Sequence, residues 1–313
     1  GVLLIEEPSR RTMCDLVERY NVTCAPIGPP VDMGVEGAEI WSKAGTRWWL
    51  GFLRTMQLGF RLVKEAHPDI MALCEDADVV ITTDTTAGAA EAAKLDIPWI
   101  SVTLQPSRIP DPDPPLMSRL VWSMIGPLTM MPFNRFRRQI GAPPARGIAG
   151  VLSDRLTLLP ISPHVAPPDP RWPDHVHVTG YWTARQPQAW RPPQDLLTFL
   201  ENGSRPIAVT LGAMSLAGED ARESAQVVLQ ALQLADVRAV VQGWPQALTE
   251  QVDLPQTLYH AGPMPHTWLF DRVSAVVHHG GFGTTGSALR AGVPAVVVPH
   301  IIDQPLWAQR VHA

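Results

Sequence analysis

One segment of the chain combines residue types that can bind phosphate. Residues 276–285 read VVHHGGFGTT, an apolar run followed by a glycine-rich turn and a helix pattern. Glycines let a backbone approach a pyrophosphate closely, and the N–H groups at a helix start point toward such an anion. His279 could donate a ring N–H to the same group, and the hydroxyls of Thr284 and Thr285 could cap the helix and contact the phosphate. An ordinary strand–helix turn with a threonine cap would explain the segment equally well.

A second polar segment follows the next apolar run. Asp303 and Gln304 come shortly after residues 295–299, which are predicted to be a buried strand. Ligands of open parallel sheets bind outside the carboxyl ends of the strands, so this pair is expected on the same sheet edge as His279. A carboxylate accepts hydrogen bonds and an amide both donates and accepts, which suits several sugar hydroxyls. Together, the two segments describe a nucleotide-sugar site.

The elements that must position these residues follow an alternating pattern. Short apolar runs alternate with helix patterns in both halves, which predicts two α/β domains with parallel sheets. In the first half, the predicted strands are 2–6, 22–26, 78–82 and 97–103, and the predicted helices are 12–20, 48–66 and 87–95. In the second half, the predicted strands are 206–211, 237–242, 258–261, 273–278 and 295–299, and the predicted helices are 219–234, 267–273, 284–291 and the segment from 304 onward.

The middle of the chain is less regular. Residues 163–193 are dense in proline and predict a semi-rigid connector, so we place the domain boundary between residues 183 and 184. Residues 117–138 are apolar with a basic end and allow two interpretations. They are either a pair of amphipathic helices that pack on their own domain or a cover over an apolar pocket that also touches membrane. Pro127 and Pro132 interrupt a long interfacial helix and favour the first interpretation.

Bulk properties exclude several classes of protein. The length of 313 residues suits two domains, and the net charge of −5 argues against nucleic-acid binding. No apolar run is long enough for a transmembrane helix and no signal peptide is expected, so a cytoplasmic location is predicted. Cys14, Cys24 and Cys74 have no metal-binding spacing and are expected to be reduced thiols. The chain starts in an apolar run and ends in a helix pattern, which indicates a piece of a longer protein.

The sequence HHGGFGTTGSALRAGVPAVVVPHIIDQPLWAQR resembles the donor-binding signature of the UDP-glycosyltransferase superfamily. It is most similar to the sterol glucosyltransferases and to the macrolide and glycopeptide glycosyltransferases. Weaker similarity extends to PIAVTLGAM, HVTGYW and PHTWLF. The resemblance implies a GT-B fold, in which two Rossmann-like domains face each other across a cleft. The first domain, residues 1–183, would bind the acceptor but lack its first strand and loop. The second, residues 184–313, would bind the donor but lack its C-terminal helices.

The resemblance also implies roles for individual residues. His279 would contact the donor phosphates, Asp303 and Gln304 would hold the sugar hydroxyls, and Gly212 and Ser215 would lie near the terminal phosphate. The remaining donor-site residues implied by the resemblance are Gly280, Gly281, Gly283, Thr284 and Ser287. No metal or other cofactor is expected, because the helix dipole and backbone donors meet the phosphate charge.

Three positions depart from the family pattern and leave the nucleotide base, UDP or dTDP, open. Ala261 stands where plant members have a base-stacking tryptophan, and Ser287 where they have a ribose-binding glutamate. Ala213 stands where a serine usually follows the glycine of the first donor strand.

Inverting sugar transfer needs a general base that takes the proton of the acceptor hydroxyl. The family's base lies in the first strand-loop, which is expected to be absent from this chain. Asp84 stands where plant members place the aspartate that orients the catalytic histidine, and it is the catalytic candidate, although it could equally cap the helix that follows. Asp111 and Asp113 imitate a metal-binding Asp-x-Asp but are expected in a solvated loop, and His266 and His300 could line the cleft or be structural.

The predicted function is transfer of a hexose, with UDP-glucose as the expected donor, to a lipophilic alcohol such as a sterol or polyketide. The aromatic residues of the first half are expected either in the core or around an apolar acceptor pocket: Trp41, Trp48, Trp49, Phe52 and Phe60. Peripheral membrane contact is a further possibility. The alternatives are a non-catalytic helper on the same fold and a nucleotide-sugar epimerase. The chain by itself is expected to show much reduced turnover.

Overall fold

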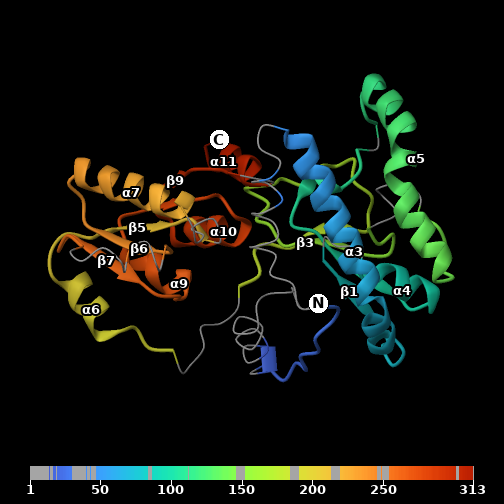
Figure 1. Cartoon of the computed structure of the whole chain (residues 1–313), viewed down its shortest axis with the longest axis horizontal. Helices are drawn as coiled ribbons and strands as arrows, with labels where there is room; N and C mark the ends of the chain where they lie inside the picture. Colours follow the sequence, from blue (N-terminus) through green and yellow to red (C-terminus); the bar gives the residue numbers. More distant parts are fainter. Residues whose placement is uncertain are drawn as a thin grey trace. The chain divides into compact units, whose positions relative to one another are not determined.

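The chain forms two compact units, Gly1–Gly180 and Tyr181–Ala313, each built around a parallel sheet (Figure 1). The computed structural model describes residues 14, 17, 18, 20–29, 40, 43, 47–83, 87–111, 113–145, 152–183, 190–212, 219–244, 248, 254–300 and 303–312. The division between the units falls three residues before the boundary placed from the proline-rich segment.

The first unit contains a sheet of four parallel strands in the order β1-β2-β3-β4. The strands are β1 (Val80–Thr82), β2 (Trp99–Val102), β3 (Thr157–Leu159) and β4 (Val176–Val178). Helix α4 (Ala89–Lys94) connects β1 to β2, whose register pairs Val80 with Trp99. The predicted strand–helix–strand unit around residues 78–103 is therefore confirmed.

A long helix, α3 (Trp48–Cys74), packs beside this unit and is eight residues longer than predicted. Its second half buries Ala66, Ile70 and Cys74 against Val80 and Leu95 of the sheet region. Pro68 lies inside the helix without ending it. Proline removes one backbone hydrogen bond but keeps a helical φ, so tertiary packing can carry a helix through it.

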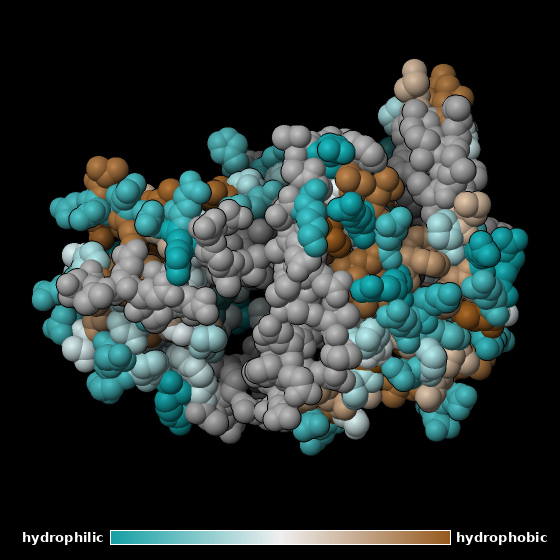
Figure 2. All heavy atoms as spheres, in the orientation of Figure 1, coloured by the Kyte–Doolittle hydropathy of each residue, from teal (hydrophilic) through white to brown (hydrophobic). Residues whose placement is uncertain are grey.

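Residues 116–139 form one continuous helix, α5 (Leu116–Gln139), preceded by the short 3₁₀ helix η1 (Pro106–Arg108). The predicted pair of helices is wrong, because the helix continues through both prolines. Met130 and Phe136 are buried, whereas Leu116 and Met117 at the start of the helix are 71% and 72% exposed. Figure 2 shows apolar residues at the end of α5 that lies at the upper right of the view. None of the helices that the structure describes combines the length and the apolar composition needed to span a lipid bilayer.

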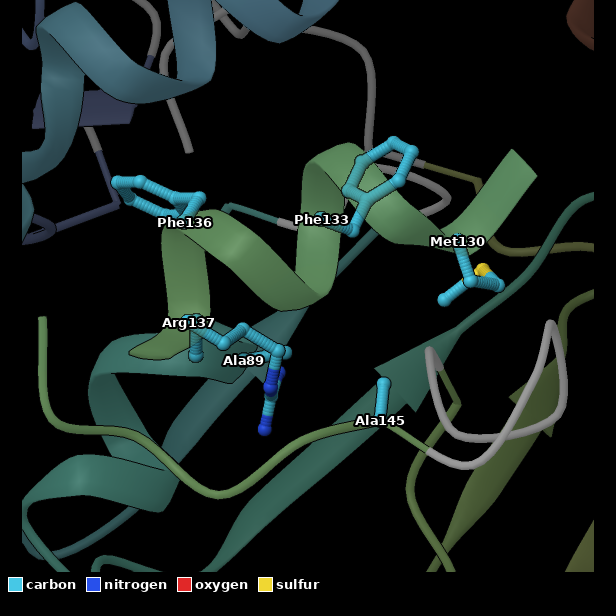
Figure 3. A pocket seen from close by; sticks show the side chains of 7 residues that line it. Ala89, Met130, Phe133, Phe136, Arg137 and Ala145 are labelled. Carbon is cyan, nitrogen blue, oxygen red and sulfur yellow. The ribbon is translucent and has the colours of Figure 1, made fainter. Parts of the chain in front are cut away.

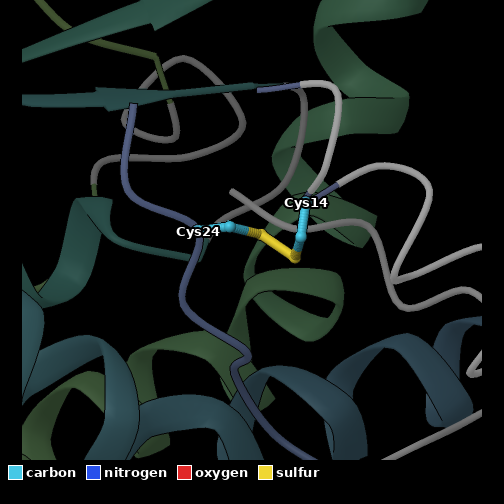
Figure 4. Close-up of a disulfide and its surroundings, with 2 residues drawn as sticks. All are labelled: Cys14 and Cys24. Carbon is cyan, nitrogen blue, oxygen red and sulfur yellow. A yellow bond between two sulfur atoms is a disulfide. The ribbon is translucent and has the colours of Figure 1, made fainter. Parts of the chain in front are cut away.

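Two expectations near the N-terminus are corrected. Residues 22–27 belong to no helix or strand among the described residues, so the strand predicted at 22–26 is wrong. Cys14 and Cys24 form a disulfide, with Cα atoms 5.2 Å apart, rather than reduced thiols (Figure 4). The chain reverses at Tyr20–Asn21 and brings the two cysteines within bonding distance, which their spacing of ten residues did not reveal. Cys74 is a buried free thiol as predicted, and burial together with the Glu91 charge raises its pKa. The predicted strand 2–6 lies outside the described residues.

The second unit contains a sheet of five parallel strands in the order β7-β6-β5-β8-β9. The strands are β5 (Ile207–Thr210), β6 (Ala239–Gln242), β7 (Leu258–Ala261), β8 (Ala275–His278) and β9 (Ala295–Val297). The helices are α6 (Gln194–Glu201), α7 (Glu219–Leu234), α9 (His266–Leu269) with the 3₁₀ turn η4 (Phe270–Arg272), α10 (Phe282–Ala291) and α11 (Gln304–His312). All five strands predicted for this half are confirmed to within two residues at each end.

The inner strands of this sheet are buried on both faces, whereas Val296 of the edge strand β9 is 57% exposed. Ala208 and Val240 belong to a cluster with Phe270 and Val276, while their neighbours Val209 and Val241 belong to a second cluster with Trp244. Successive residues of a strand point to opposite faces, so apolar residues at consecutive positions mean two covered faces. For this reason the strands read as continuous apolar runs in the sequence.

Candidate donor-binding site

The strands β5, β8 and β9 are neighbours in the second sheet, so their carboxyl ends form one edge of it. Gly212 follows β5, the turn 279–281 follows β8, and Asp303 and Gln304 follow β9. The structure therefore brings together the two segments that the sequence analysis placed on one edge.

Helix α10 begins with no side-chain cap. Gly281 is its N-cap, and Thr284 and Thr285 lie inside the first turn, where both are buried. The predicted threonine cap is wrong, because the helix starts two residues earlier than the pattern indicated. The first intrahelical bond runs from the Thr285 N–H to the Gly281 carbonyl at 2.9 Å. The three preceding N–H groups, of residues 282–284, have no acceptor within the helix and suit an anion.

The imidazole of His279 lies between two glycines. A Cβ added to Gly212 would lie 2.7 Å from Cε1 of His279, and one added to Gly281 would lie 2.3 Å from its Nε2. Gly212 also has a φ of +57°, which favours glycine. The missing Cβ atoms of the two glycines thus leave a slot for the His279 ring beside the start of α10.

The electrostatic surroundings keep His279 mostly neutral. Burial lowers its pKa, and nearby His300 lowers it further. The Thr210 backbone carbonyl and the Asp303 carboxylate oppose this shift without reversing it. The buried Nδ1 has no hydrogen-bond partner of acceptable geometry in the described part of the chain. An arriving phosphate would raise the pKa, because an adjacent negative charge favours the protonated ring.

Gly280 holds the turn tightly against the next elements. Its φ is +86°, and a Cβ there would lie 2.7 Å from Cγ1 of Val297 and 3.1 Å from the carbonyl oxygen of Gln304. Gly283 is different, since a Cβ there would meet nothing within 4 Å and its φ is ordinary. Nothing in the described fold requires glycine at this position, which keeps the surface of the first turn open.

The sugar-binding candidates make contacts within the protein. Asp303 accepts a hydrogen bond at Oδ2 from Nε1 of Trp307 at 2.7 Å. Gln304 is 6% exposed, and its Oε1 accepts the His300 N–H at 2.7 Å. The carboxylate of Asp303 is thereby oriented, and Gln304 fixes the loop that leads into α11. Their binding of sugar hydroxyls remains a prediction.

Further predicted residues have varied surroundings. The hydroxyl of Ser287 donates to the Gly283 carbonyl at 2.9 Å, within its own helix. Thr285 is fully buried, and its Oγ1 has no partner among the described residues. Asp84 and Ser215 lie outside the residues that the structure describes, so their predicted roles are untested.

The weaker candidates are explained by local structure. Asp111 is an exposed loop residue that forms an ion pair with Arg171 at 3.2 Å and accepts the Asp113 N–H at 3.0 Å. Within the described ranges, no group of three or more histidine, cysteine or acidic side chains is arranged to hold a metal ion. His300 is exposed.

A polar layer continues along the same sheet edge, at the ends of β6 and β7. Nε2 of His266 lies 2.9 Å from Oε1 of Gln242, and its ring stacks on Phe270. Nε2 of His260 lies 2.8 Å from the Gly243 carbonyl. Burial lowers the pKa of His266, and His279 lowers it further, so the two histidines influence each other. The sequence analysis missed Gln242 and His260, although polar residues at the ends of apolar runs could have indicated them.

His278 is a further residue that the sequence analysis did not select. It is fully buried at the end of β8, and its Nδ1 accepts the Gly280 N–H at 3.1 Å. Burial lowers its pKa to about 4, with smaller contributions from His279 and His266. The signal in the sequence was a polar residue at the inward position of an apolar strand.

The aromatic residues expected around an acceptor pocket are only partly described. Phe60 packs edge-on against Phe133 and Phe136 of α5, with ring centroids 5.5 and 6.2 Å apart. A small cavity nearby is lined by Met130, Phe133, Phe136 and Arg137 of α5, by Ala89 and Ala90 of α4, and by Ala145 in the segment after α5 (Figure 3). It leaves about 20 Å³, room for about one water molecule and far too little for a sterol. The side chains of Trp41, Trp48, Trp49 and Phe52 are outside the described set.

Comparison with solved structures shows the class of the fold. The glycotransferase of kitacinnamycin is 18% identical, with a TM-score of 0.63 over 96% of this chain and 74% of that one. The glycosyltransferase VinC, solved in complex with dTDP, gives a TM-score of 0.62 at 21% identity over 95% of this chain and 74% of that one. The chain therefore has the GT-B glycosyltransferase fold, as predicted.

Sequence comparison gives the relatives within that class. Residues 226–313 match the family described as Erythromycin biosynthesis protein CIII-like, C-terminal domain. The sterol 3-beta-glucosyltransferase of Komagataella phaffii is 32% identical over 331 aligned residues, 94% of this chain and 26% of that protein. The O-mycaminosyltylonolide 6-deoxyallosyltransferase of Streptomyces fradiae is 39% identical over 180 residues, 56% of this chain and 41% of that protein.

These findings confirm the resemblance to sterol and macrolide glycosyltransferases. The chain spans only 26% of the length of the Komagataella enzyme and 18% of a second sterol 3-beta-glucosyltransferase, from Leptosphaeria maculans.

Proposed function

We propose that this chain binds a nucleotide sugar in its second unit and takes part in inverting transfer of a hexose to a hydroxyl of a lipophilic acceptor, such as a sterol or polyketide. The observation that carries the proposal is the start of α10. Uncapped N–H groups, a histidine held between two glycines and the open Gly283 lie together on one sheet edge. Such an arrangement stabilises the diphosphate that leaves when the sugar is transferred.

The parts of the site have distinct tasks in this proposal. The N–H groups of residues 282–284 and the ring of His279 meet the negative charge that develops on the diphosphate. Asp303, oriented by Trp307, accepts hydrogen bonds from sugar hydroxyls. UDP-glucose is the proposed donor, and dTDP sugars are the alternative, since VinC was solved with dTDP. The general base that takes the acceptor proton belongs to the acceptor side, where Asp84 is the candidate in this chain for orienting it.

No metal is part of the proposed mechanism, because the helix dipole and the backbone N–H groups at the start of α10 supply the positive potential. Binding and transfer should therefore be unchanged in excess EDTA. A loss of binding that Mg²⁺ restores would contradict this part of the proposal.

A cytoplasmic location with peripheral membrane contact is also proposed, and α5 is the candidate contact. The exposed Leu116, Met117 and Leu120 at its start would enter the lipid interface. Co-sedimentation with liposomes should fall when Leu116 and Leu120 are both changed to glutamate. Equal sedimentation of both proteins would contradict membrane contact through this helix.

The test of donor binding is calorimetric titration of UDP, dTDP and UDP-glucose into the wild type, His279→Ala and Gly283→Ala. His279→Ala should lose about tenfold or more in affinity for a diphosphate, since a hydrogen bond to a charged group contributes about 1.5–3 kcal/mol. Gly283→Ala adds a methyl group that touches none of the residues that the structure describes and should raise helix stability by about 0.5–1 kcal/mol. Its affinity should nevertheless fall, because the diphosphate needs that space. Full affinity in both folded variants would overturn the proposed site.

A further inference from the structure

His278 occupies a position where an apolar side chain would be expected. It points to the same face of β8 as Val276, and both residues are 0% exposed. Val276 belongs to the apolar cluster on that face, together with Ala288 of α10. A buried imidazole among such neighbours carries a desolvation cost that valine or leucine would avoid. A specific interaction is therefore needed to explain the histidine.

That interaction is a hydrogen bond to the glycine-rich turn. The Gly280 N–H donates to Nδ1 of His278 at 3.1 Å, and this bond is buried. Nδ1 must therefore carry a lone pair, so the bond assigns the neutral tautomer with the proton on Nε2. Nε2 is also buried and has no partner in the described part of the chain. Of the two nitrogens, only Nδ1 has an observed role.

Gly280 is the residue of the turn whose orientation matters most. The turn consists of residues 279–281, so Gly280 directly links His279 to the N-cap of α10. The left-handed φ of +86° and the close packing against Val297 and Gln304 leave its backbone little room on the outer side. The hydrogen bond to Nδ1 of His278 also restrains the peptide group between His279 and Gly280. A rotation at Gly280 would change the position of His279 relative to the first N–H groups of α10.

We propose that His278 is a positioning residue of the phosphate site, whose Nδ1 holds the Gly280 N–H inward and thereby fixes His279 and the start of α10 in the orientation that binds a diphosphate. The consequence for diphosphate affinity rests on the proposed function, whereas the positioning of Gly280 does not. The state of the ring agrees with this role, because burial lowers the pKa of His278 to about 4 and keeps the acceptor nitrogen unprotonated at neutral pH. The titratable groups that act on it are His279 in the turn and His266 of α9.

Two near-isosteric substitutions distinguish the role of Nδ1 of His278 from that of Nε2. His278→Asn places a side-chain oxygen close to the position of Nδ1 and keeps an acceptor for Gly280. His278→Gln places its polar group near Nε2 and removes that acceptor. His278→Ala removes both and serves as the second acceptor-free variant if the glutamine does not fold. His260→Asn is the matched control, since His260 also bonds a backbone group, the Gly243 carbonyl, but lies on β7.

The first readout is hydrogen exchange of the Gly280 amide in the ligand-free protein, followed by NMR. Exchange should be slow in the wild type, His278→Asn and His260→Asn, and about tenfold faster in His278→Gln and His278→Ala, as for the loss of one hydrogen bond. The second readout is affinity for UDP and dTDP compared with uridine and thymidine. The acceptor-free variants should bind the diphosphates about tenfold more weakly and the nucleosides within about twofold of the wild type.

If His278 had only a structural role, the asparagine and glutamine variants would behave alike. The affinity for nucleosides would then fall as much as the affinity for diphosphates. Equal Gly280 exchange in all folded variants, or no rescue by asparagine, overturns the inference. If the exchange pattern holds but the wild type binds neither diphosphate, the proposed function is overturned, and the consequence for phosphate affinity with it. The ligand-free exchange result then shows that His278 still positions the turn.

Discussion

Substitution of Gly281 by alanine tests the slot that holds His279. The φ of −63° and ψ of 146° at Gly281 are accessible to alanine, so no backbone strain is introduced. The new Cβ would lie 2.3 Å from Nε2 of His279, whereas ordinary contacts begin at 3.4 Å. The ring must therefore move by about 1 Å. A shift of that size can remove a hydrogen bond to a charged group, worth about 1.5–3 kcal/mol, so diphosphate affinity should fall by about 10- to 150-fold.

Calorimetric titration of UDP and dTDP measures this effect, and urea denaturation accompanies it. Alanine is a poorer N-cap than glycine, so a loss of about 1 kcal/mol in the free energy of unfolding is expected as well. Gly59→Ala is the control for the exchange itself. Gly59 lies inside α3, and a Cβ there would meet no described residue within 4 Å. This variant should be slightly more stable and should bind nucleotides as the wild type does.

A double-mutant cycle with His279→Ala decides whether the effect passes through the ring. With the imidazole removed, the methyl group that Gly281→Ala introduces has space, so this substitution should have almost no further effect on affinity. Wild-type affinity for the diphosphates in the folded Gly281→Ala variant would refute the inference that Gly281 leaves necessary space for the His279 ring. Additive losses in the double variant would show that the alanine acts on the ligand directly rather than on His279.

Three further predictions concern stability. Gly286→Ala should lower the free energy of unfolding by about 1–3 kcal/mol, because its Cβ would lie 2.7 Å from the Tyr181 ring. Combining it with Tyr181→Leu should remove this loss, as measured by urea denaturation. His278 has a pKa of about 4 in the fold and an ordinary value of 6.5. Its neutral ring therefore stabilises the fold fully above pH 6.5, and this stabilisation is lost as the pH falls toward 4. The free energy of unfolding should drop by about 3 kcal/mol across this range, and His278→Asn should flatten the drop; equal slopes would contradict the assignment. Glu91→Leu should lower the free energy of unfolding by about 3 kcal/mol or more, because the buried side chain accepts from the Gly88 N–H and contacts His67 at 2.7 Å. Glu91→Gln, which keeps one acceptor oxygen but no charge, should cost clearly less; an equal loss would show that the charge, rather than the retained hydrogen bond, carries the stabilisation.

The second unit was largely predictable from local patterns. Its strands are continuous apolar runs because both sheet faces are covered, and such runs are visible without any structure. The errors fall where local signals were weak. Strands β3 and β4 were not predicted, and β4 lies inside the proline-rich segment that was interpreted as a connector. Strand formation depends strongly on packing against neighbouring strands, which the local sequence does not show.

The predicted helix boundaries erred where a proline or a cap was interpreted too literally. The pattern ended α3 before Pro68 and divided α5 at its prolines, yet both helices continue. Threonines favoured a later start of α10, although Gly281 is the cap. In each case, packing of the helix on its unit outweighed a preference of at most a few kcal/mol.

By itself, the sequence determined the α/β class, the order of the elements in the donor half and the segments that meet at the sheet edge. These properties depend on apolar periodicity and on residues adjacent along the chain. Only the tertiary structure decided that Gly212 and Gly281 enclose the His279 ring, that Tyr181 packs on Gly286 and that His278 turns inward to hold Gly280. The physical reason is that two of these contacts, Gly212 with His279 and Tyr181 with Gly286, join residues far apart in sequence. The contacts within residues 278–281 depend on the backbone conformation of the turn and on the face of β8 that is buried, which tertiary packing determines.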